Sequence, residues 1–295
     1  MGELLFAAFM MVRLVQRQPL LSLASPVAAV SETETQPVFT LSTFAPRRAP
    51  TLDPHLAEQL SATNVLVREL GGAVLLNQHG SEIKPIASLT KLMTTLEAIE
   101  RYDVETKFTI SKTAVATEGT TGDFIVGEMF GRDELIKAAL VASSNDAAEA
   151  LAERAGREAF VAAMNVRASS LGLRSTRYVE PTGISPENVA SLDDLVVLVD
   201  YLWRNQPDLL RWSTLEATTL HGARTRQLLN LDYLISTHRG VIVGSKTGST
   251  PAAGECLVLI IHLPGAPPIF VGLLNSAHRF DDAQKILTAL TEAYR

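Results

Sequence analysis

The clearest helical pattern in the chain is Pro85-Ile86-Ala87-Ser88-Leu89-Thr90-Lys91-Leu92-Met93-Thr94-Thr95-Leu96-Glu97-Ala98-Ile99. Its apolar residues recur at helical spacing, which predicts a helix with one buried face. Ser88 falls where that helix starts, and Lys91 follows one turn later on the same side. A hydroxyl at a helix N-terminus gains from free backbone N–H groups, and a desolvated lysine nearby can take its proton. The stretch alone fits a helix cap with a solvated lysine equally well.

The composition is that of a folded chain without a nucleic-acid surface. The 295 residues are 46% hydrophobic and 20% charged, with a net charge of −6 and no dense Lys/Arg cluster. The single cysteine, Cys256, excludes an intrachain disulfide framework and lies in an apolar run, which favours a packed core residue. The six histidines show no metal-ligand spacing, so we expect no metal and no cofactor.

The N-terminal part predicts export. Two apolar runs in residues 1–30 are interrupted by Arg13 and Arg17, and neither supplies the roughly 20 continuous apolar residues of a membrane span. A signal peptide fits, with both arginines as its positive region and small residues at 27–29 for cleavage. An uncleaved N-terminal membrane anchor is the alternative. Residues 31–58 are rich in Ser, Thr, Pro and Glu, which predicts a linker.

The remaining residues, 59–295, predict one α+β domain. Strand patterns cover residues 64–68, 73–76, 240–246, 256–262 and 269–274. Helical patterns fill most of the interval between the second and third strand, and one more closes the chain at 280–294. This order predicts an antiparallel sheet of about five strands, built from both ends of the chain and flanked by helices. An all-helical lobe is expected as an insertion, roughly over residues 103–235.

The spacing Ser-x-x-Lys occurs twice, at Ser81–Lys84 and at Ser88–Lys91. Ser81 follows Gly80 in a turn-like run, and Pro85 disfavours helical geometry at Lys84. The first pair is therefore not expected to share a helical face, and the context selects Ser88 and Lys91.

Two further motifs follow in order. Ser143-Ser144-Asn145 falls between two predicted helices, and Lys246-Thr247-Gly248 ends a predicted strand. Each has a structural explanation, as a helix cap or as a glycine turn. The succession Ser-x-x-Lys, Ser-x-Asn, Lys-Thr-Gly, however, matches the motif set of penicillin-binding proteins and class A β-lactamases.

From about residue 61 to the end, the chain resembles low-molecular-mass penicillin-binding proteins of the D-alanyl-D-alanine carboxypeptidase family. Further stretches support the resemblance: Asp146-Ala147-Ala148, Glu180-Pro181-Thr182-Gly183, Ala253-Gly254 and Asn275-Ser276. The resemblance implies a DD-peptidase/β-lactamase-like fold. It also implies a serine-type D-alanyl-D-alanine carboxypeptidase that acts on peptidoglycan stem peptides through an acyl-enzyme on Ser88.

The resemblance assigns a role to each matched residue. Lys91 would be the general base, with its ammonium form disfavoured by burial and by Lys246, and Ser143 would relay a proton to the leaving amine. The substrate would be bound by Asn145, Lys246, Thr247, Gly248 and Ser249, with Gly248 admitting the peptide close to the strand. The oxyanion hole would be the backbone N–H groups of Ser88 and Ser249.

Other functions stay open beside the carboxypeptidase. Ser245 before the Lys-Thr-Gly motif and the run from Glu180 to Asn188 resemble an endopeptidase that cuts D-alanyl cross-links. A β-lactamase would need a water-positioning glutamate, and no Glu-x-x-Leu-Asn occurs where that loop should fall. A penicillin-sensing or peptidoglycan-binding module that turns over negligibly would keep the same serine. Ser144 stands where the family commonly has glycine, and we expect the β-rich C-terminal domain of some family members to be absent.

The resemblance also implies partners and a location. The substrate would be a stem peptide ending in D-Ala-D-Ala, and β-lactams would be covalent inhibitors, with no nucleic-acid partner. The protein would be periplasmic or otherwise in the extracytoplasmic cell envelope, and would contact a membrane only through an uncleaved N-terminus.

Overall fold

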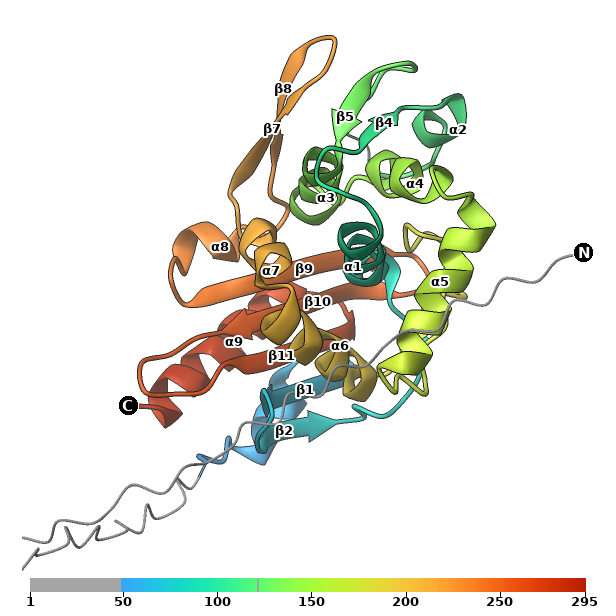
Figure 1. The fold of residues 1–295 in the computed structure, drawn as a ribbon. Helices are drawn as coiled ribbons and strands as arrows, with labels where there is room; N and C mark the ends of the chain where they lie inside the picture. The colour runs from blue at the N-terminus through green and yellow to red at the C-terminus, as the bar shows by residue number, and fades with distance from the viewer. Residues whose placement is uncertain (1–48, 121) are drawn as a thin grey trace, which may run out of the picture. The chain divides into compact units, whose positions relative to one another are not determined.

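The computed structural model describes residues 49–120 and 122–295 (Figure 1). The predicted signal peptide or anchor, residues 1–30, and the predicted linker as far as residue 48 lie outside the described residues. The predicted catalytic domain, residues 59–295, is described except for residue 121.

A five-stranded antiparallel sheet forms the centre of the described residues. Its order is β2 (Val74–Gln78), β1 (Asn64–Glu69), β11 (Ile269–Ser276), β10 (Gly254–Ile261) and β9 (Ile242–Thr250). Strands from the two ends of the domain pair directly, with Val67 opposite Val271. The predicted α+β fold, with a sheet built from both ends of the chain, is confirmed.

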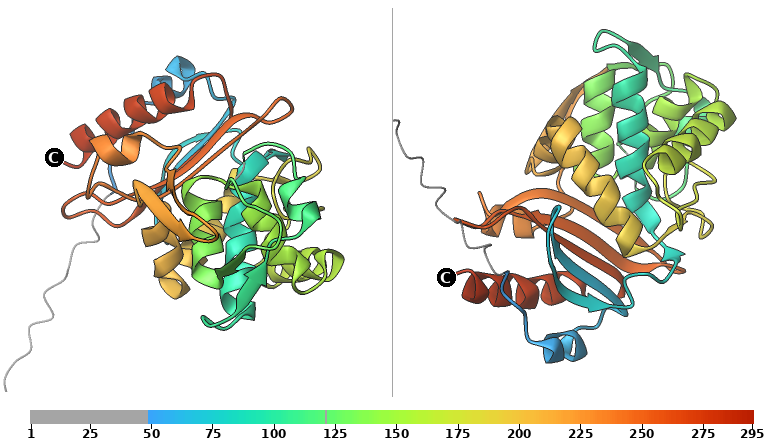
Figure 2. Two further views of the ribbon diagram at one scale, coloured as in Figure 1. Left: turned by 90° about the horizontal axis from the view of Figure 1, so that it is seen from above. Right: turned by 60° about the horizontal axis from the view of Figure 1, so that its bottom comes forward.

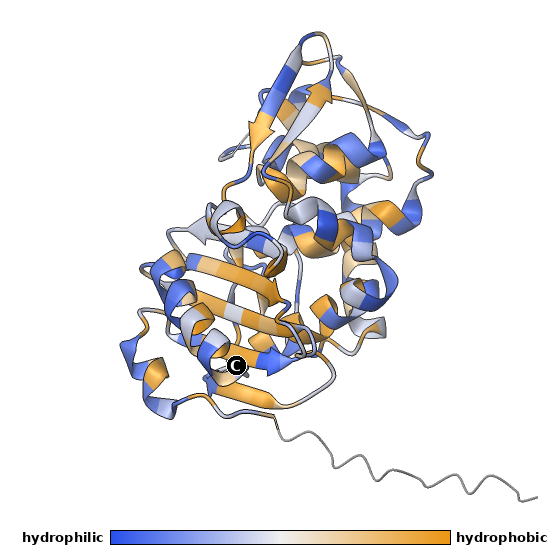
Figure 3. Ribbon diagram, turned by 90° about the vertical axis from the view of Figure 1, so that its left-hand side faces the viewer, coloured by the Kyte–Doolittle hydropathy of each residue, from blue (hydrophilic) through white to orange (hydrophobic). Residues whose placement is uncertain are grey.

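Both faces of this sheet are covered, which explains why its central strands are apolar along most of their length (Figure 3). Successive side chains alternate between the faces. Val65, Val67, Val271 and their neighbours pack with residues of helix α9 (Arg279–Ala293). Leu66, Val258 and Phe270 pack on the opposite face with helix α6 (Leu192–Asn205) and the helical lobe (Figure 2).

The lobe follows β3 (Lys84–Pro85) and the 3-10 turn η2 (Ala87–Thr90). Its helices are α1 (Lys91–Arg101), α2 (Lys112–Val115), α3 (Arg132–Val141), α4 (Asn145–Glu153), α5 (Arg157–Ser170) and α7 (Pro207–Ser213). It also contains two hairpins, β4 (Lys107–Thr109) with β5 (Met129–Gly131) and β7 (Ala217–His221) with β8 (Thr225–Leu229), and β6 (Val189–Ala190) pairs with β3. The short helix α8 (Leu234–Thr237) follows the lobe and packs with the α9 side of the sheet.

Two details of the predicted lobe are wrong. It is not all-helical, because short polar strands such as Thr225–Leu229 give little apolar periodicity and depend on pairing with their neighbour. It also begins before residue 103, since α1 packs against α3, α4 and α5.

The folded domain begins earlier than the sequence predicts. The 3-10 helix η1 (Pro54–Gln59) buries Leu56 and Ala57, and Leu52 before it is also buried. Asp53 caps η1 by accepting a hydrogen bond from the N–H of His55 at 2.9 Å. The predicted linker is therefore wrong at its C-terminal end, where proline-rich composition masked a short apolar helix.

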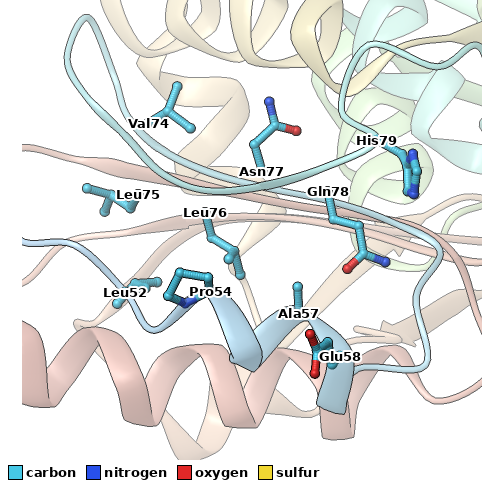
Figure 4. Close-up of a pocket in the computed structure, with 10 residues that line it drawn as sticks. All are labelled: Leu52, Pro54, Ala57, Glu58, Val74, Leu75, Leu76, Asn77, Gln78 and His79. Carbon is cyan, nitrogen blue, oxygen red and sulfur yellow. The ribbon is translucent and has the colours of Figure 1, made fainter.

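A cavity of about 570 Å³ separates η1 from strand β2 (Figure 4). It is lined by Leu52, Pro54, Ala57, Glu58 and the residues of β2 with His79. None of the predicted site residues is among the described residues that line it, so this cavity is not the predicted site.

Candidate active site

Ser88 lies in the 3-10 turn η2, three residues ahead of the start of α1 at Lys91. The prediction that the helix begins at Ser88 is wrong by one turn, and the Ser88 hydroxyl does not cap the helix. Ala87, just before it, has φ of 47°, an uncommon conformation for a residue with a side chain. The chain therefore turns sharply just before the predicted nucleophile, and the Ser88 hydroxyl lies 2.8 Å from Lys91 Nζ.

The turn at Ala87 is held by Gly183. A Cβ on Gly183 would lie 2.0 Å from the Ala87 carbonyl oxygen, and Gly183 itself has φ of 91°. Only glycine fits both requirements. The Pro-Thr-Gly segment that supported the family resemblance is thus packed against the backbone of the predicted nucleophile.

Lys91 is fully buried, and its Nζ lies within hydrogen-bond distance of three oxygens among the described residues. These are Ser88 Oγ at 2.8 Å, Asn145 Oδ1 at 2.6 Å and the Thr182 carbonyl at 2.6 Å. Burial lowers the pKa of Lys91 to about 7, although the carboxylates of Glu180 and Asp146 act to raise it. In the neutral amine, two N–H groups can satisfy Asn145 and Thr182, so the lone pair is left for the Ser88 hydroxyl.

Ser143 and Lys246 form a second pair across the site. Lys246 Nζ donates to Ser143 Oγ at 2.9 Å and to the Thr247 carbonyl at 2.8 Å. Burial, then the charges of Lys91 and Arg279, hold the pKa of Lys246 well below its usual range. Ser143 lies in the turn between α3 and α4 and has φ of 56°, which is a strained conformation for serine. This turn places the Ser143 hydroxyl within hydrogen-bond distance of Lys246 Nζ.

Asn145 is the first residue of α4, and Ser144 caps that helix by accepting from the N–H of Ala147 at 3.0 Å. The Asn145 side chain is held at both ends, since Oδ1 accepts from Lys91 and Nδ2 donates to the Glu118 carbonyl at 2.6 Å. Ser143 and Ser144 lie between the two helices as predicted, whereas Asn145 already belongs to α4. The predicted contact between Asn145 and Lys91 is present.

The Lys-Thr-Gly motif lies within β9 and not at its end, because the strand continues to Thr250. A Cβ on Gly248 would lie 2.9 Å from the backbone nitrogen of Ser88 and 3.1 Å from the Ala87 Cβ. The glycine is therefore needed for the packing of β9 against η2, as well as for any approach of a peptide. Ser249 follows it on the strand and is exposed.

The structure brings the residues of all three motifs to one place, on η2 with α1, the α3–α4 turn and β9. Residues 51–272 match the peptidase S11 family of D-alanyl-D-alanine carboxypeptidases. The chain belongs to this family.

Relatives agree with this assignment. The chain is 37% identical to a D-alanyl-D-alanine endopeptidase of Pseudomonas aeruginosa, over 78% of this chain and 77% of that protein. It is 32% identical to a D-alanyl-D-alanine endopeptidase of Escherichia coli, over 73% and 72% of the two chains. The solved Streptomyces K15 DD-transpeptidase superposes with a TM-score of 0.71 at 26% identity, over 78% of this chain and 97% of that one. The chain is a low-molecular-mass penicillin-binding protein of the DD-peptidase family and a serine peptidase.

Three charged residues of this DD-peptidase were not assigned to its site from the sequence. Arg279, at the start of α9, donates from Nη1 to the Gly248 carbonyl at 2.8 Å. Asp232 is buried and accepts from Ser245 Oγ at 2.6 Å, on the strand that carries Lys246. Asp146 is buried and accepts from the N–H of Gly122 at 2.8 Å. Asp146 directly follows the Ser-x-Asn motif, and Arg279 lies three residues after the Asn275-Ser276 stretch, so a signal for both was present in the sequence. The hydrogen bond between Asp232 and Ser245 on β9 has no such signal and is visible only in the structure.

Proposed function

We propose that this peptidase is a serine D-alanyl-D-alanine carboxypeptidase in which Ser88 is the nucleophile and Lys91 the general base. The observation that carries the proposal is the 2.8 Å contact between Lys91 Nζ and Ser88 Oγ. A general base must lie within this reach of the proton that it removes. The lowered pKa of about 7 makes the neutral amine available near neutral pH.

The chemistry follows from these positions. Lys91 takes the Ser88 proton as Oγ attacks the carbonyl carbon, so that a C–O bond forms and the C–N bond to the terminal residue breaks. Ser143 relays a proton to the leaving amine and is supported from behind by Lys246 Nζ at 2.9 Å. Water then attacks the acyl-enzyme ester, the C–O bond to Ser88 breaks, the shortened peptide leaves as a carboxylate, and Ser88 Oγ regains its proton.

Cations around β9 support binding of the substrate's terminal carboxylate. Lys246 lies beside Thr247, and Arg279 donates to the Gly248 carbonyl on the same strand. A bound carboxylate favours the protonated form of Lys246, which burial disfavours in the empty site. Asn145 and Gly248 would border the peptide. The N–H groups of Ser88 and Ser249 would stabilise the oxyanion, where loss of one such donor typically costs roughly 3–4 kcal/mol.

The endopeptidase reaction is the second candidate. It is favoured by the names of the Pseudomonas and Escherichia relatives, which are both D-alanyl-D-alanine endopeptidases. The run from Glu180 to Asn188 resembles the endopeptidases in sequence, and it contacts Lys91 through the Thr182 carbonyl. Ser245 adds less, because its hydroxyl is turned to Asp232 and is buried.

The matched family consists of D-alanyl-D-alanine carboxypeptidases, whose name gives D-alanyl-D-alanine as the substrate group. The proposed partners are therefore peptidoglycan stem peptides as substrates and β-lactams as covalent inhibitors. The proposed location is the extracytoplasmic cell envelope, where such peptides occur. Within the described residues, no helix has the length and apolar character required to cross a bilayer.

Mass spectrometry of purified peptidoglycan fragments tests the proposal. Pentapeptide monomers and cross-linked dimers are incubated with the full chain and with its Ser88→Ala variant. Loss of one alanine from the pentapeptide supports the carboxypeptidase, and conversion of dimers to monomers supports the endopeptidase. Absence of both products, with penicillin labelling intact, would overturn both and favour a binding module.

A further inference from the structure

Glu180 lies next to Thr182, whose carbonyl is the third hydrogen-bond partner of Lys91, and the residue is only 8% exposed. Its Oε2 accepts from the N–H of Thr182 at 2.7 Å and from Thr182 Oγ1 at 2.5 Å. Its Oε1 accepts from the N–H of Gly183 at 2.6 Å and from Asn188 Nδ2 at 2.7 Å. Within the described chain, the hydrogen-bond partners of both oxygens are thus donors.

These bonds fix a turn that faces the site. The same Thr182 whose N–H and hydroxyl are held by Glu180 presents its carbonyl to Lys91 Nζ at 2.6 Å. Gly183, also held by Glu180, packs against the carbonyl of Ala87 next to the nucleophile. The carboxylate therefore fixes the position of the Thr182 carbonyl, which contacts Lys91, and of Gly183, which packs against the turn that carries Ser88.

Asn188 ties this carboxylate to the start of the nucleophile helix. Its Nδ2 also donates to Thr90 Oγ1 at 3.1 Å, and Thr90 Oγ1 donates in turn to the Ala87 carbonyl at 2.8 Å. Its Oδ1 accepts from the N–H of Val179 at 2.7 Å. Glu180, Asn188 and Thr90 thus form a buried network below Ser88 and Lys91.

Charge adds to this geometry. The charged groups that bear on Lys91 from the surrounding elements are Glu180 on the loop after α5, Asp146 on α4 and Lys246 on β9. Glu180 is the larger of the two influences that raise the pKa of Lys91 against the effect of burial. Its negative charge favours the ammonium form and keeps the neutral amine a stronger base.

We propose that Glu180 is a positioning residue that orients Lys91 through the Thr182 carbonyl and places a buried negative charge next to this hydrogen bond. This inference rests on the proposed function, since it assumes that Lys91 is the base for Ser88. Glu180 does not touch the substrate; it acts through the Thr182 carbonyl and through its field.

The variant Glu180→Gln separates this role from simple packing. Glutamine has nearly the same shape, but its NH₂ group would face a backbone N–H donor on whichever side it took, so at least one hydrogen bond to the backbone of Thr182 or Gly183 would be lost. We expect the acylation rate constant for a fluorescent penicillin to fall about tenfold or more. The midpoint of its rise with pH should also move to lower pH, because loss of the negative charge disfavours the Lys91 ammonium.

Glu149→Gln is the matched control. Glu149 is another buried glutamate of the lobe, 3% exposed and paired with Arg157 at 2.6 Å. It follows Asn145 by one turn of α4, but among the described residues its carboxylate forms no hydrogen bond with Ser88, Asn145 or Thr182, and it is not among the charges that shift the pKa of Lys91. The midpoint in this variant should stay at the wild-type pH. A folded Glu180→Gln protein with the wild-type midpoint overturns the proposal, whether or not its plateau rate has fallen.

Glu180→Asp provides a second measurement that keeps the charge and shortens the side chain. We expect a plateau rate several-fold below wild type with an unmoved midpoint, and a shifted midpoint would overturn the proposal even if Glu180→Gln did not fold. The proposed function fails separately: the wild-type protein would then show no pH limb that depends on Lys91, or labelling would survive in Ser88→Ala.

Discussion

At the scale of single residues, Ser88 and Lys91 form a reactive pair because of their 2.8 Å contact and not because of their spacing in the sequence. Lys84 has the same spacing to Ser81, but it is partly exposed and pairs with Glu82 at 3.1 Å. Ser88→Ala should lower labelling by fluorescent penicillin about a thousandfold or more. Lys91→Ala should lower it roughly 100- to 10,000-fold, and Lys84→Ala at most about twofold. An essential Lys84 would contradict the assignment of the pair.

The titration of Lys91 gives a second prediction at this scale. Burial lowers its pKa from 10.5 to about 7, and the base is active as the neutral amine. Acylation should therefore increase with pH through a midpoint near 7 and level off above it. Stopped-flow labelling across this range measures the profile. An increase that began only near the ordinary pKa of lysine would show that Lys91 is not held as the structure indicates.

At the scale of elements, the site depends on the packing of the 180–188 loop and of β9 against the turn η2. Gly183→Ala would place a Cβ 2.0 Å from the Ala87 carbonyl, so η2 must move. We expect the labelling rate to fall about tenfold or more, because small displacements of reacting groups cost this much. Gly127→Ala is the matched control: its φ of 90° is nearly the 91° of Gly183, but no atom lies within 4 Å of the added Cβ. Equal rates in both variants would contradict the role of this packing.

The sequence predicted the helices and strands whose apolar residues recur at regular spacing, and the motifs whose side chains form the site. The helices from α3 to α7 and the strands of the sheet follow apolar patterns, and Ser88, Lys91, Ser143, Asn145 and Lys246 converge as the resemblance implied. The β7–β8 hairpin was missed because its polar strands are specified by their partner. The network of Glu180 with Asn188 could not be predicted, since hydrogen bonds between loop residues leave no period in a sequence.

At the scale of the whole described domain, strands from its two ends pair in one sheet. Strand β1 pairs with β11, and α9 covers the face that β1 helps to form. The site lies beyond the other face, with β9 on one side and the helical lobe on the other. Because β9 is reached only through the lobe in sequence, the order of the three motifs along the chain reflects this topology.

Asp282 on α9 forms hydrogen bonds to residues from both ends of the described domain, which gives a prediction at this scale. Its buried carboxylate accepts from the N–H of Ser61 and of Ala62, both at 2.9 Å, and from Ser276 Oγ at 2.8 Å. Asp282→Ala leaves the buried Ala62 N–H and Ser276 hydroxyl, and the more exposed Ser61 N–H, without their acceptor, so the free energy of unfolding should fall by about 3 kcal/mol. Urea unfolding measures the change, and Asp281→Ala, at the exposed neighbouring position, should stay within about 0.5 kcal/mol of wild type. Asp282 forms hydrogen bonds with β11 and with the segment before β1, but with none of the proposed site residues, so penicillin labelling of the folded variant should be unchanged. Similar stability of the Asp282→Ala and Asp281→Ala variants would show that α9 does not hold the two ends of the domain together in this way.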